Sequence, residues 1–580
     1  MINKLKNIIK NNKIISFDIF DTLLIHPYYK PDDLFLHLEY LERAENFKQI
    51  RIKAKETALK QLKDKEEISL DDIYINIPQK YKYLKEKELE IEYQTLQTNP
   101  EIIDIFNYAK SLNKKIIITS DMYLPYEFVE KILKKNGITE YYKLYLSSKE
   151  NKTKNSSSLY KKILTDLNIS PSKIFHIGDN KYSDYDVPRQ LGINSFLYPK
   201  AINRFINSNK IFFYLSKTKK MSLGISIALG ICAINWIKNK ERNNYFYNLG
   251  FNVAGIANYC FCNFINKEAI KNNINQIFFV TRDGYTLEKS FKIFNNNIPT
   301  NYVTLNRFQK KIEEFINGIN LDKDEYQQII LFLQQAFPNN ELIKTYNSNT
   351  TNIQDFISNN YDSLKILLSR YKKIFYDYIK NITNSAIKNI LVADSITKSF
   401  SAALLAKQIL QDKNIYSITL QTAAKTVPKG ITSLYLLKPQ NKYAGFQNWN
   451  LMEFFFSAPT TQVLGINFMG EFIYDKENYY EKSNITAYND VSVGMIDFVK
   501  ETKNIFLNHD AFIDIDDVIL VVNSFCTYYT NSDYANMKAI FHSSDNNQIY
   551  ENILSKKSLL KRKFNKLKRD LKKAIFSKLT

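Results

Sequence analysis

Four short segments in a fixed order constrain this 580-residue chain more than any other feature. They are FDIFDTLL with Asp18, IIITSDMYLP with Ser120, a loop with Lys154, and HIGDNKYSD with Asp179. Except for the Lys154 loop, each coincides with the end of an apolar run that is typical of a buried strand. Ligands of an open parallel sheet bind at the carboxyl ends of its strands. The segments therefore predict that these polar residues, though far apart in sequence, meet at one edge of a parallel sheet.

The beginning of the chain is predicted to be of the α/β class, because apolar stretches alternate with helical patterns. The expected strands lie at residues 14–17, 114–120, 142–147 and 173–177. Residues 30–100 are charged and rich in helical patterns. A chain of 580 residues exceeds one hydrophobic core, so two or three domains are expected.

The residue types in the four segments fit phosphoryl chemistry. A carboxylate such as Asp18 attacks phosphorus and forms an aspartyl-phosphate. Because this joins two anions, a hard cation such as Mg²⁺ is needed, and Asp179 and Asp184 supply a second acidic loop for it. The Ser120 hydroxyl and the Lys154 ammonium can neutralise phosphoryl oxygens in the transition state.

In order and spacing, these motifs resemble those of the haloacid dehalogenase (HAD) superfamily over about residues 12–200. The resemblance implies that Asp18 is the nucleophile and that the backbone carbonyl of Phe20 joins Asp18, Asp179 and Asp184 around Mg²⁺. It also implies a HAD-like Rossmannoid domain over residues 1–205, with a core at 1–26 and 101–205 and a helical cap at 27–100. The remaining candidates for binding phosphate or substrate here are Thr22 and Asp121.

One residue departs from the pattern of the phosphatases in this superfamily. They usually have a second aspartate two positions after the nucleophile, which protonates the leaving oxygen. Phe20 occupies that position, and Asp21 follows it. Three explanations are open. Asp21 acts as the acid and base through an altered loop, the leaving group needs no proton, or the domain is a degraded binding module. Weak activity on generic phosphate esters is expected.

Three neighbours of the motifs have simpler interpretations. His26 is expected at the surface, with the cap entrance as the alternative, and His176 is expected to be structural. Asp121 either orients the substrate or caps the next helix.

Residues 206–480 are predicted to form a second α/β domain with apolar helices. Its expected strands lie at 276–280, 300–305, 389–393 and 416–421. Polar residues that follow them predict a binding site for a phosphate, a carboxylate or a nucleotide-sugar. Helix caps and internal salt bridges are the alternative. The residues of this candidate site are Arg282, Asp283, Arg307 and Asp394.

A wider resemblance adds the later segments FFVTRDGY and EFFFSAP, the latter beginning at Glu453. Together with the first motifs they resemble large bacterial HAD-family proteins associated with capsule and lipopolysaccharide biosynthesis. This resemblance implies a phosphorylated sugar, glycan precursor or nucleotide-sugar as substrate and possible glycosyltransferase partners. Residues 481–555, expected to be helical or mixed, carry no functional signal.

The last 25 residues concentrate positive charge. Residues 556–580 contain eleven Lys or Arg and one acid, whereas the whole chain has a net charge of +21. Apolar residues recur there at helical spacing, so a basic amphipathic helix is predicted. Such a helix suits an anionic membrane surface. Docking on the protein itself is the main alternative, and nucleic acid is not an expected partner.

The protein is expected to be cytoplasmic, or peripheral on the inner membrane. The N-terminal residues lack the pattern of a signal peptide. Residues 221–237 are apolar but too short for a typical span, so a buried helix is predicted.

The function expected from these features is a Mg²⁺-dependent phosphatase or phosphotransferase acting on a phosphorylated sugar or glycan precursor. Two rivals remain. One is a glycosyl- or phospho-group transferase with its main site in the second domain, and the other is a non-catalytic scaffold with a degraded HAD fold.

Overall fold

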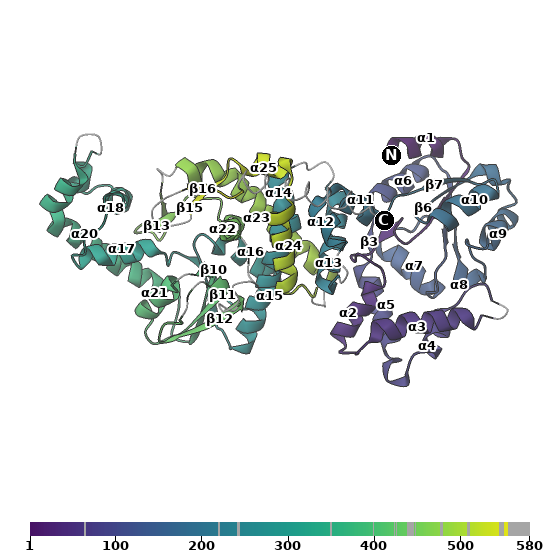
Figure 1. Cartoon of the computed structure of the whole chain (residues 1–580), viewed down its shortest axis with the longest axis horizontal. Coiled ribbons are helices and arrows are strands. Elements are labelled where there is room, and N and C mark those ends of the chain that lie inside the picture. The colour runs from purple at the N-terminus through teal and green to yellow at the C-terminus, as the bar shows by residue number, and fades with distance from the viewer. Residues whose placement is uncertain are drawn as a thin grey trace, which may run out of the picture. The chain divides into compact units, whose positions relative to one another are not determined.

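The computed structural model describes residues 1–62, 65–217, 221–239, 244–347, 351–397, 399–422, 424, 426–437, 446, 448–475, 479–506, 511–543 and 550–554. The chain forms two compact units, which are considered separately (Figure 1). The first consists of residues 1–243 and 501–517, and the second of residues 244–500 and 518–580. The first unit thus includes helices beyond residue 205. The predicted basic helix at 556–580 lies outside the described residues.

A five-stranded parallel sheet forms the centre of the first unit, with the order β5-β4-β1-β6-β7. Its strands are β1 (Ile14–Phe17), β4 (Lys115–Ser120), β5 (Lys143–Leu146), β6 (Ile174–Gly178) and β7 (Asn194–Leu197). The first four were predicted within a residue at either end, whereas β7 was not predicted. Because β1 is central and fully buried, the residue that follows it lies between the ends of β4 and β6.

α1 (Ile2–Lys10) precedes the sheet, and the helices between its strands include α6 (Pro100–Ser111), α7 (Tyr126–Lys135), α8 (Ser147–Glu150), α9 (Ser158–Leu167) and α10 (Val187–Gln190). The apolar face of α9 shows how they are held. Leu159, Tyr160 and Ile163 are buried against Ile117 of β4 and Ile174 of β6. Burial of side chains of this size stabilises the fold by about 1.5–3 kcal/mol each.

The predicted cap region is an insertion framed by a short antiparallel pair, β2 (Leu24–Ile25) with β3 (Gln97–Thr98). It contains α2 (Asp33–Leu41), α3 (Phe47–Lys60), α4 (Leu70–Ile75) and α5 (Leu84–Thr95). Arg51 of α3 is fully buried and forms a two-pronged ion pair with Glu88 of α5, with distances of 2.6 and 2.8 Å. The Arg51 guanidinium also lies 5.0 Å from the ring of Tyr123, in the loop after β4. The cap is therefore anchored to the core by a buried cation.

The apolar stretch considered as a membrane span is α13 (Leu223–Lys238), which follows α11 (Ala201–Ser208) and α12 (Lys210–Leu215). Almost all of its residues are buried, and it packs on α2, α6 and α11. Among the described residues, no helix combines the length and apolar character needed to cross a membrane.

A second five-stranded parallel sheet lies in the second unit, with the order β12-β11-β10-β8-β9. Its strands are β8 (Gln276–Val280), β9 (Thr300–Val303), β10 (Asn389–Thr397), β11 (Asn414–Thr422) and β12 (Ile431–Leu437). β12 was not predicted. The predicted end of β10 at residue 393 was wrong, because the strand continues through Asp394 and Ser395 and stays paired with β11. The main packed helices are α15 (Gly255–Lys271), α16 (Gly284–Phe294), α20 (Ile353–Asn381) and α21 (Ser401–Ile409).

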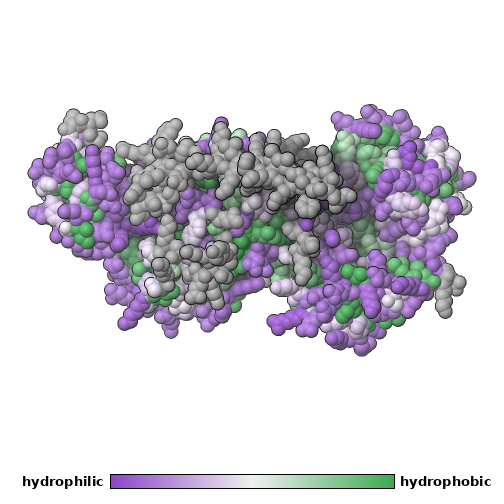
Figure 2. All heavy atoms as spheres, in the orientation of Figure 1, coloured by the Kyte–Doolittle hydropathy of each residue, from purple (hydrophilic) through white to green (hydrophobic). Residues whose placement is uncertain are grey.

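The other helices are α14 (Tyr245–Leu249), α17 (Arg307–Ile316), α18 (Lys323–Ala336), α19 (Glu341–Lys344), α22 (Trp449–Phe456), α23 (Tyr479–Phe506), α24 (Ile515–Tyr528) and α25 (Asn531–Met537). Two antiparallel strand pairs are also present, β13 (Val463–Ile466) with β14 (Phe472–Tyr474) and β15 (Phe541–Ser543) with β16 (Tyr550–Asn552). On the face shown in Figure 2, hydrophilic residues predominate over α18 and α20. Their apolar sides instead contribute Leu333 and Leu368 to the core beneath.

Candidate active site

Asp18 is the first residue after β1, and its side chain is almost completely buried. Its backbone N–H donates a hydrogen bond to the carbonyl of Ile177 in β6, at 2.9 Å. This contact ties the start of the loop after β1 to the end of β6. The two acidic motifs are therefore brought together by the pairing of the two strands, as their sequence positions predicted.

Lys154 is buried between the two acidic loops. Its Nζ lies 2.7 Å from Oδ1 of Asp18 and 2.5 Å from Oδ1 of Asp184. The loop that holds it is anchored by Asp121, whose carboxylate accepts hydrogen bonds from the backbone N–H groups of Lys154 and Asn155 at 2.7 and 3.2 Å. These contacts give Asp121 a role that was not predicted, namely to hold the lysine loop in place.

Asp184 is held from three sides. Besides Lys154, it accepts the backbone N–H of Asn180 at 2.9 Å and contacts Nε2 of His176 at 3.1 Å. The other ring nitrogen of His176 is 2.7 Å from Oγ of Ser16 in β1. His176 is fully buried, and it therefore supports Asp184 from beneath the sheet edge, as its predicted structural role requires.

Gly178 explains why the last acidic motif needs a glycine. A Cβ added at this position would lie 2.6 Å from the Cβ of Asp184, which is closer than real side chains approach. The chain turns back after β6, so that Asp184 packs directly over the Gly178 backbone. Only glycine leaves room for this carboxylate.

A second lysine, which sequence reasoning missed, pairs with the outer part of the site. Lys200 Nζ lies 2.9 Å from Oδ2 of Asp179 and 2.6 Å from Oδ2 of Asp21. Thr22 donates from Oγ1 to Oδ1 of Asp179 at 3.4 Å. Lys200 follows β7, and because that strand was not predicted, this lysine could not be placed at the sheet edge.

Carboxylate oxygens of Asp18, Asp179 and Asp184 lie within 4.8 Å of one another. Carboxylates are the ligands that Mg²⁺ prefers, so this donor set fits a magnesium ion. Ser120 lies at the neighbouring strand end, as the last residue of β4, and is buried. Phe20, whose carbonyl was an expected ligand, follows Asp18 in the same loop, and its ring stacks on His26 with centroids 5.7 Å apart.

Burial and charge separate the acidities of the three carboxyl groups. Burial raises the pKa of Asp18 to about 8, and the carboxylates of Asp184 and Asp179 add to the rise, although Lys154 opposes it. Burial also raises the pKa of Asp179, against Lys200. The pKa of Asp184 is instead lowered, because Lys154 and His176 outweigh its burial. Asp184 is therefore the ionised partner of Lys154, and Asp18 is the carboxyl group that gains most from a bound cation.

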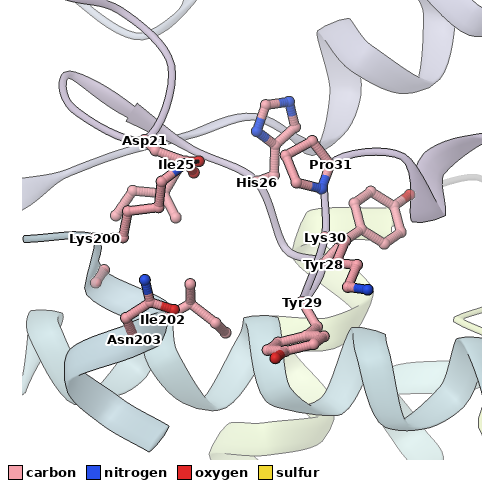
Figure 3. Close-up of a pocket in the computed structure, with 11 residues that line it drawn as sticks. Asp21, Ile25, His26, Tyr28, Tyr29, Lys30, Pro31, Lys200, Ile202 and Asn203 are labelled. Carbon is pink, nitrogen blue, oxygen red and sulfur yellow. Dashed lines mark hydrogen bonds and ion pairs between the residues drawn. The ribbon is translucent and has the colours of Figure 1, made fainter. Parts of the chain in front are cut away.

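A cavity of about 240 Å³ adjoins this site in the first unit, and Asp21 and Lys200 line it. In Figure 3, Ile202 and Asn203 rise from α11 on one side, while Asp21, His26 and Pro31 come from the segment after β1. The expectation that His26 lies at the surface was wrong, because its side chain is buried and its Nε2 lies 3.0 Å from Oε1 of Glu92 in the cap. His26 lies in the segment between β2 and α2 that leads into the cap, and no sequence pattern indicated that this segment is buried.

The candidate residues of the second unit gather around the ends of β8 and β10. Asp283 accepts a hydrogen bond from Oγ of Ser395, and Arg282 forms an ion pair with Glu481 at 2.8 Å. Burial, and next the charge of Asp283, raises the pKa of Asp394 well above its usual range, while Arg307 acts in the opposite direction. Asp283 and Arg307 therefore both act on Asp394, whereas Arg282 is paired with Glu481 inside the unit.

Comparison with protein families identifies the first part of the chain. Residues 12–192 match the model of the family described as haloacid dehalogenase-like hydrolase. Residues 12–192 form a HAD-like hydrolase domain. No curated protein matches the chain.

Solved structures similar to the chain include a HAD phosphatase from Thermococcus onnurineus, with 17% identity, 32% of this chain and 85% of that chain covered, and a TM-score of 0.25. A predicted phosphoglycolate phosphatase from Haemophilus somnus has 12% identity, with 33% and 90% covered and a TM-score of 0.24. A HAD family enzyme from Bacteroides thetaiotaomicron, in complex with magnesium and inorganic phosphate, has 16% identity, with 33% and 95% covered and a TM-score of 0.25.

Proposed function

We propose that the HAD-like domain is a Mg²⁺-dependent phosphatase or phosphotransferase that acts through an aspartyl-phosphate on Asp18. The observation that carries this proposal is the buried arrangement in which Lys154 contacts both Asp18 and Asp184, with Asp179 beside them. A buried nucleophile, a fixed cation and a carboxylate cluster are the groups that attack on a phosphate monoester requires.

Each group has a defined part in the reaction. An Oδ of Asp18 attacks phosphorus, the bond from phosphorus to the leaving oxygen breaks, and that oxygen takes up a proton. Water, or an acceptor alcohol in a phosphotransferase, then attacks the aspartyl-phosphate and restores the carboxylate. Lys154 and Ser120 neutralise the phosphoryl oxygens, and Asp184 and Asp121 position Lys154. Mg²⁺ held by Asp18, Asp179, Asp184 and the carbonyl of Phe20 would screen the repulsion between the two anions.

The source of the leaving-group proton distinguishes this site from other phosphatases. Phe20 cannot supply it, and Asp21 is engaged by Lys200 at 2.6 Å. For Asp21 to act as the acid it must exchange this ion pair for the substrate. Loss of a general acid typically costs about 10²- to 10⁴-fold in rate. We therefore expect esters with good leaving groups to react faster than alkyl esters.

A phosphorylated sugar or glycan precursor is the substrate class that we propose. This choice rests on the resemblance of the whole motif series to HAD-family proteins of surface polysaccharide biosynthesis. The proposed place in surface polysaccharide biosynthesis likewise rests on that resemblance alone.

A second candidate function belongs to the second unit, as a transferase of glycosyl or phospho groups. It is favoured by the interacting carboxyl groups of Asp283, which follows β8, and Asp394, within β10. Arg307 acts on Asp394, and Asp283 acts on Arg282. Such a pair can accept hydrogen bonds from substrate hydroxyls, and an arginine can bind phosphate.

Phosphate release from a panel of sugar phosphates and nucleotide-sugars tests the proposal, with MgCl₂ or EDTA, for the wild type and Asp18→Asn. We expect Mg²⁺-dependent release that Asp18→Asn lowers at least about 10³-fold. Asp104→Asn is the matched control, because Asp104 is exposed on α6 and belongs to none of the motifs. Release that survives in Asp18→Asn would exclude Asp18 as nucleophile. Mg²⁺-dependent binding without turnover would favour a scaffold.

A further inference from the structure

Each of the three carboxylates proposed to hold Mg²⁺ contacts a lysine. Lys154 contacts Asp18 and Asp184 at 2.7 and 2.5 Å. Lys200 contacts Asp179 at 2.9 Å. The two lysines differ in how firmly they are held, because the side chain of Lys154 is 3% exposed and that of Lys200 is 37% exposed. Lys200 also lies beyond residue 192, where the match to the family model ends.

The Lys200 ammonium has two carboxylate partners at once. Its Nζ lies 2.6 Å from Oδ2 of Asp21 and 2.9 Å from Oδ2 of Asp179 (Figure 3). Only one of these two carboxylates, that of Asp179, belongs to the donor set proposed for Mg²⁺. An ammonium group donates up to three hydrogen bonds. Lys200 therefore keeps a charged partner, Asp21, when it releases Asp179.

The backbone on both sides of Lys200 is fixed. Before it, Tyr198 is fully buried, and its backbone N–H donates to the carbonyl of the last residue of β6 at 2.7 Å. After it, Arg204 of α11 forms a two-pronged ion pair with Glu101 of α6, with distances of 2.5 and 3.0 Å. Release of Asp179 is therefore a rotation of the flexible Lys200 side chain that leaves β7 and α11 in place.

A lysine on Asp179 competes with Mg²⁺ for the same carboxylate. Both cations use the oxygen lone pairs of that group, and two positive charges a few ångströms apart repel each other. When the form that can bind is only partly populated, the apparent Kd rises in inverse proportion to its population. If Asp179 is free of Lys200 in about one molecule in ten, Mg²⁺ binds about tenfold more weakly than it would without the lysine.

We infer that Lys200 is the resident counter-ion of Asp179 and has to release this carboxylate for Mg²⁺ to bind, while Asp21 retains the lysine. Lys200 thereby sets the affinity of the site for the metal, and Asp21 acts on the metal site through Lys200. This inference deepens the proposed function and rests on it for the location of the Mg²⁺ site. It does not depend on turnover, because it concerns the binding of the metal alone.

Calorimetric titration of the full-length protein with MgCl₂, without substrate, tests this inference. Lys200→Met and Lys200→Gln remove the charge and keep a long side chain, so we expect each to lower the Kd for Mg²⁺ about five- to twentyfold. Lys200→Arg keeps the charge and should bind Mg²⁺ no more tightly than the wild type. Lys181→Met is the matched control, because Lys181 lies in the same loop as Asp179 but pairs with Asp186, and its side chain is 63% exposed. It should change Kd less than about twofold, since an exposed charge is screened by salt.

Asp21→Asn tests the second partner. In the wild type it should weaken Mg²⁺ binding at least about threefold, because Lys200 then has only Asp179 to pair with. In the Lys200→Met background the same change should have a clearly smaller effect, since no lysine remains to be retained. Equal effects in the two backgrounds would exclude this part for Asp21.

The inference is overturned if Lys200→Met and Lys200→Gln lower Kd no more than Lys181→Met does, or if the full-length protein binds no Mg²⁺. These results are distinct from those that test the reaction. The expected differences in Kd would support the inference even if no phosphate ester is hydrolysed. Mg²⁺-dependent phosphate release with a Kd that is independent of Lys200 would overturn it and leave the proposed function in place.

Discussion

Asp18 is a residue whose surroundings favour its protonated form. The single positive charge of Lys154 is shared between the buried carboxyl groups of Asp18 and Asp184. Asp184 has two further hydrogen-bond partners, His176 and the backbone N–H of Asn180. Burial raises the pKa of Asp18 from 3.8 to about 8, because the shared charge of Lys154 offsets only part of the effect of burial. Ionising Asp18 is therefore unfavourable unless a further positive charge lies close to it, and pKa values shifted in this way are common at functional sites.

This shift predicts how stability depends on pH. Between about pH 4 and pH 8 the folded state holds a proton on Asp18 that the unfolded chain has lost, so this group makes stability fall as pH rises. Asp18→Asn keeps the neutral form. In EDTA, we expect the variant to become increasingly more stable than the wild type from pH 5 to pH 8, by roughly 1 kcal/mol per pH unit, with no further gain above that window.

Unfolding by urea at several pH values, followed by amide exchange of peptides from the core, measures this difference. Asp104→Asn controls for the loss of one carboxylate from the surface. A stability difference that stays constant, or that shrinks with rising pH, contradicts the raised pKa of Asp18.

At the level of single elements, β6 and the turn after it position the last acidic motif. Gly178 ends the strand, and Asp184 folds back over it. Gly178→Ala would push the Asp184 carboxylate away from Lys154 and His176. We expect this change to weaken Mg²⁺ binding and lower phosphate release at least about tenfold, because a misplacement of about 1 Å at a reacting group costs on the order of 10²-fold.

Isothermal titration with MgCl₂ checks the first effect, and the phosphate assay checks the second. Circular dichroism establishes that the variant is folded. Unchanged Mg²⁺ affinity and turnover would mean that Asp184 can move aside without loss, and that its place over Gly178 is unimportant for the site.

The cap depends on one buried ion pair. Glu88 of α5 is the carboxylate that compensates the fully buried Arg51, and it also accepts a hydrogen bond from Tyr74 at 2.8 Å. Removing one partner of such a pair leaves an uncompensated charge and costs about 3–5 kcal/mol. We predict that Glu88→Gln speeds amide exchange in α3 and α5 by about tenfold for every 1.4 kcal/mol of this loss in stability.

The same helix offers the control. Glu90 pairs with Lys87 at 3.1 Å, but both side chains are about 40% exposed, at 41% and 42%. Exposed pairs contribute about 0–1 kcal/mol, so Glu90→Gln should change exchange little. Equal effects of the two variants would show that the Arg51 pair does not hold the cap.

Across the whole molecule, most of the strands that the sequence predicts contain an apolar run, and the edge strand β9 (TNYV) is the exception. QIFFV in β8 is buried throughout, and its bounds were predicted correctly. The two missed strands, β7 and β12, lie at sheet edges and are half exposed, so their sequences NSFL and ITSLYLL carry no clear apolar pattern. Asp394 and Ser395 misled the prediction of β10 because tertiary pairing keeps polar residues in that strand.

The same reasons decide which site residues were found. Asp18, Lys154 and Asp184 were found from the order of the motifs. Pairing of β1 with β6 brings the two acidic loops together, and Asp121 holds the loop of Lys154. Lys200 depends on β7, and the burial of His26 depends on how the cap linker packs. Neither is encoded in a local pattern. The sequence was therefore sufficient to predict Asp18 and Lys154, but not the cavity that Lys200 and His26 line.

A last prediction concerns how far a bound cation acts through the chain. All proposed ligands of Mg²⁺ belong to the first unit, at the ends of β1 and β6. A ligand present at about 100 times its Kd stabilises the state that binds it by about 2.7 kcal/mol. MgCl₂ should therefore slow amide exchange in peptides around Asp18, Lys154 and Asp179 by up to about 100-fold.

Peptides of the second sheet, such as those that cover β8 and β10, should exchange equally fast with MgCl₂ and with EDTA. Asp18→Asn should abolish most of the protection in the first unit, because it removes a ligand charge. Hydrogen exchange read by mass spectrometry reports on both units in one experiment. Protection that extends to β8 and β10 would contradict a cation site confined to the first unit, since the free energy of binding would then be distributed over both.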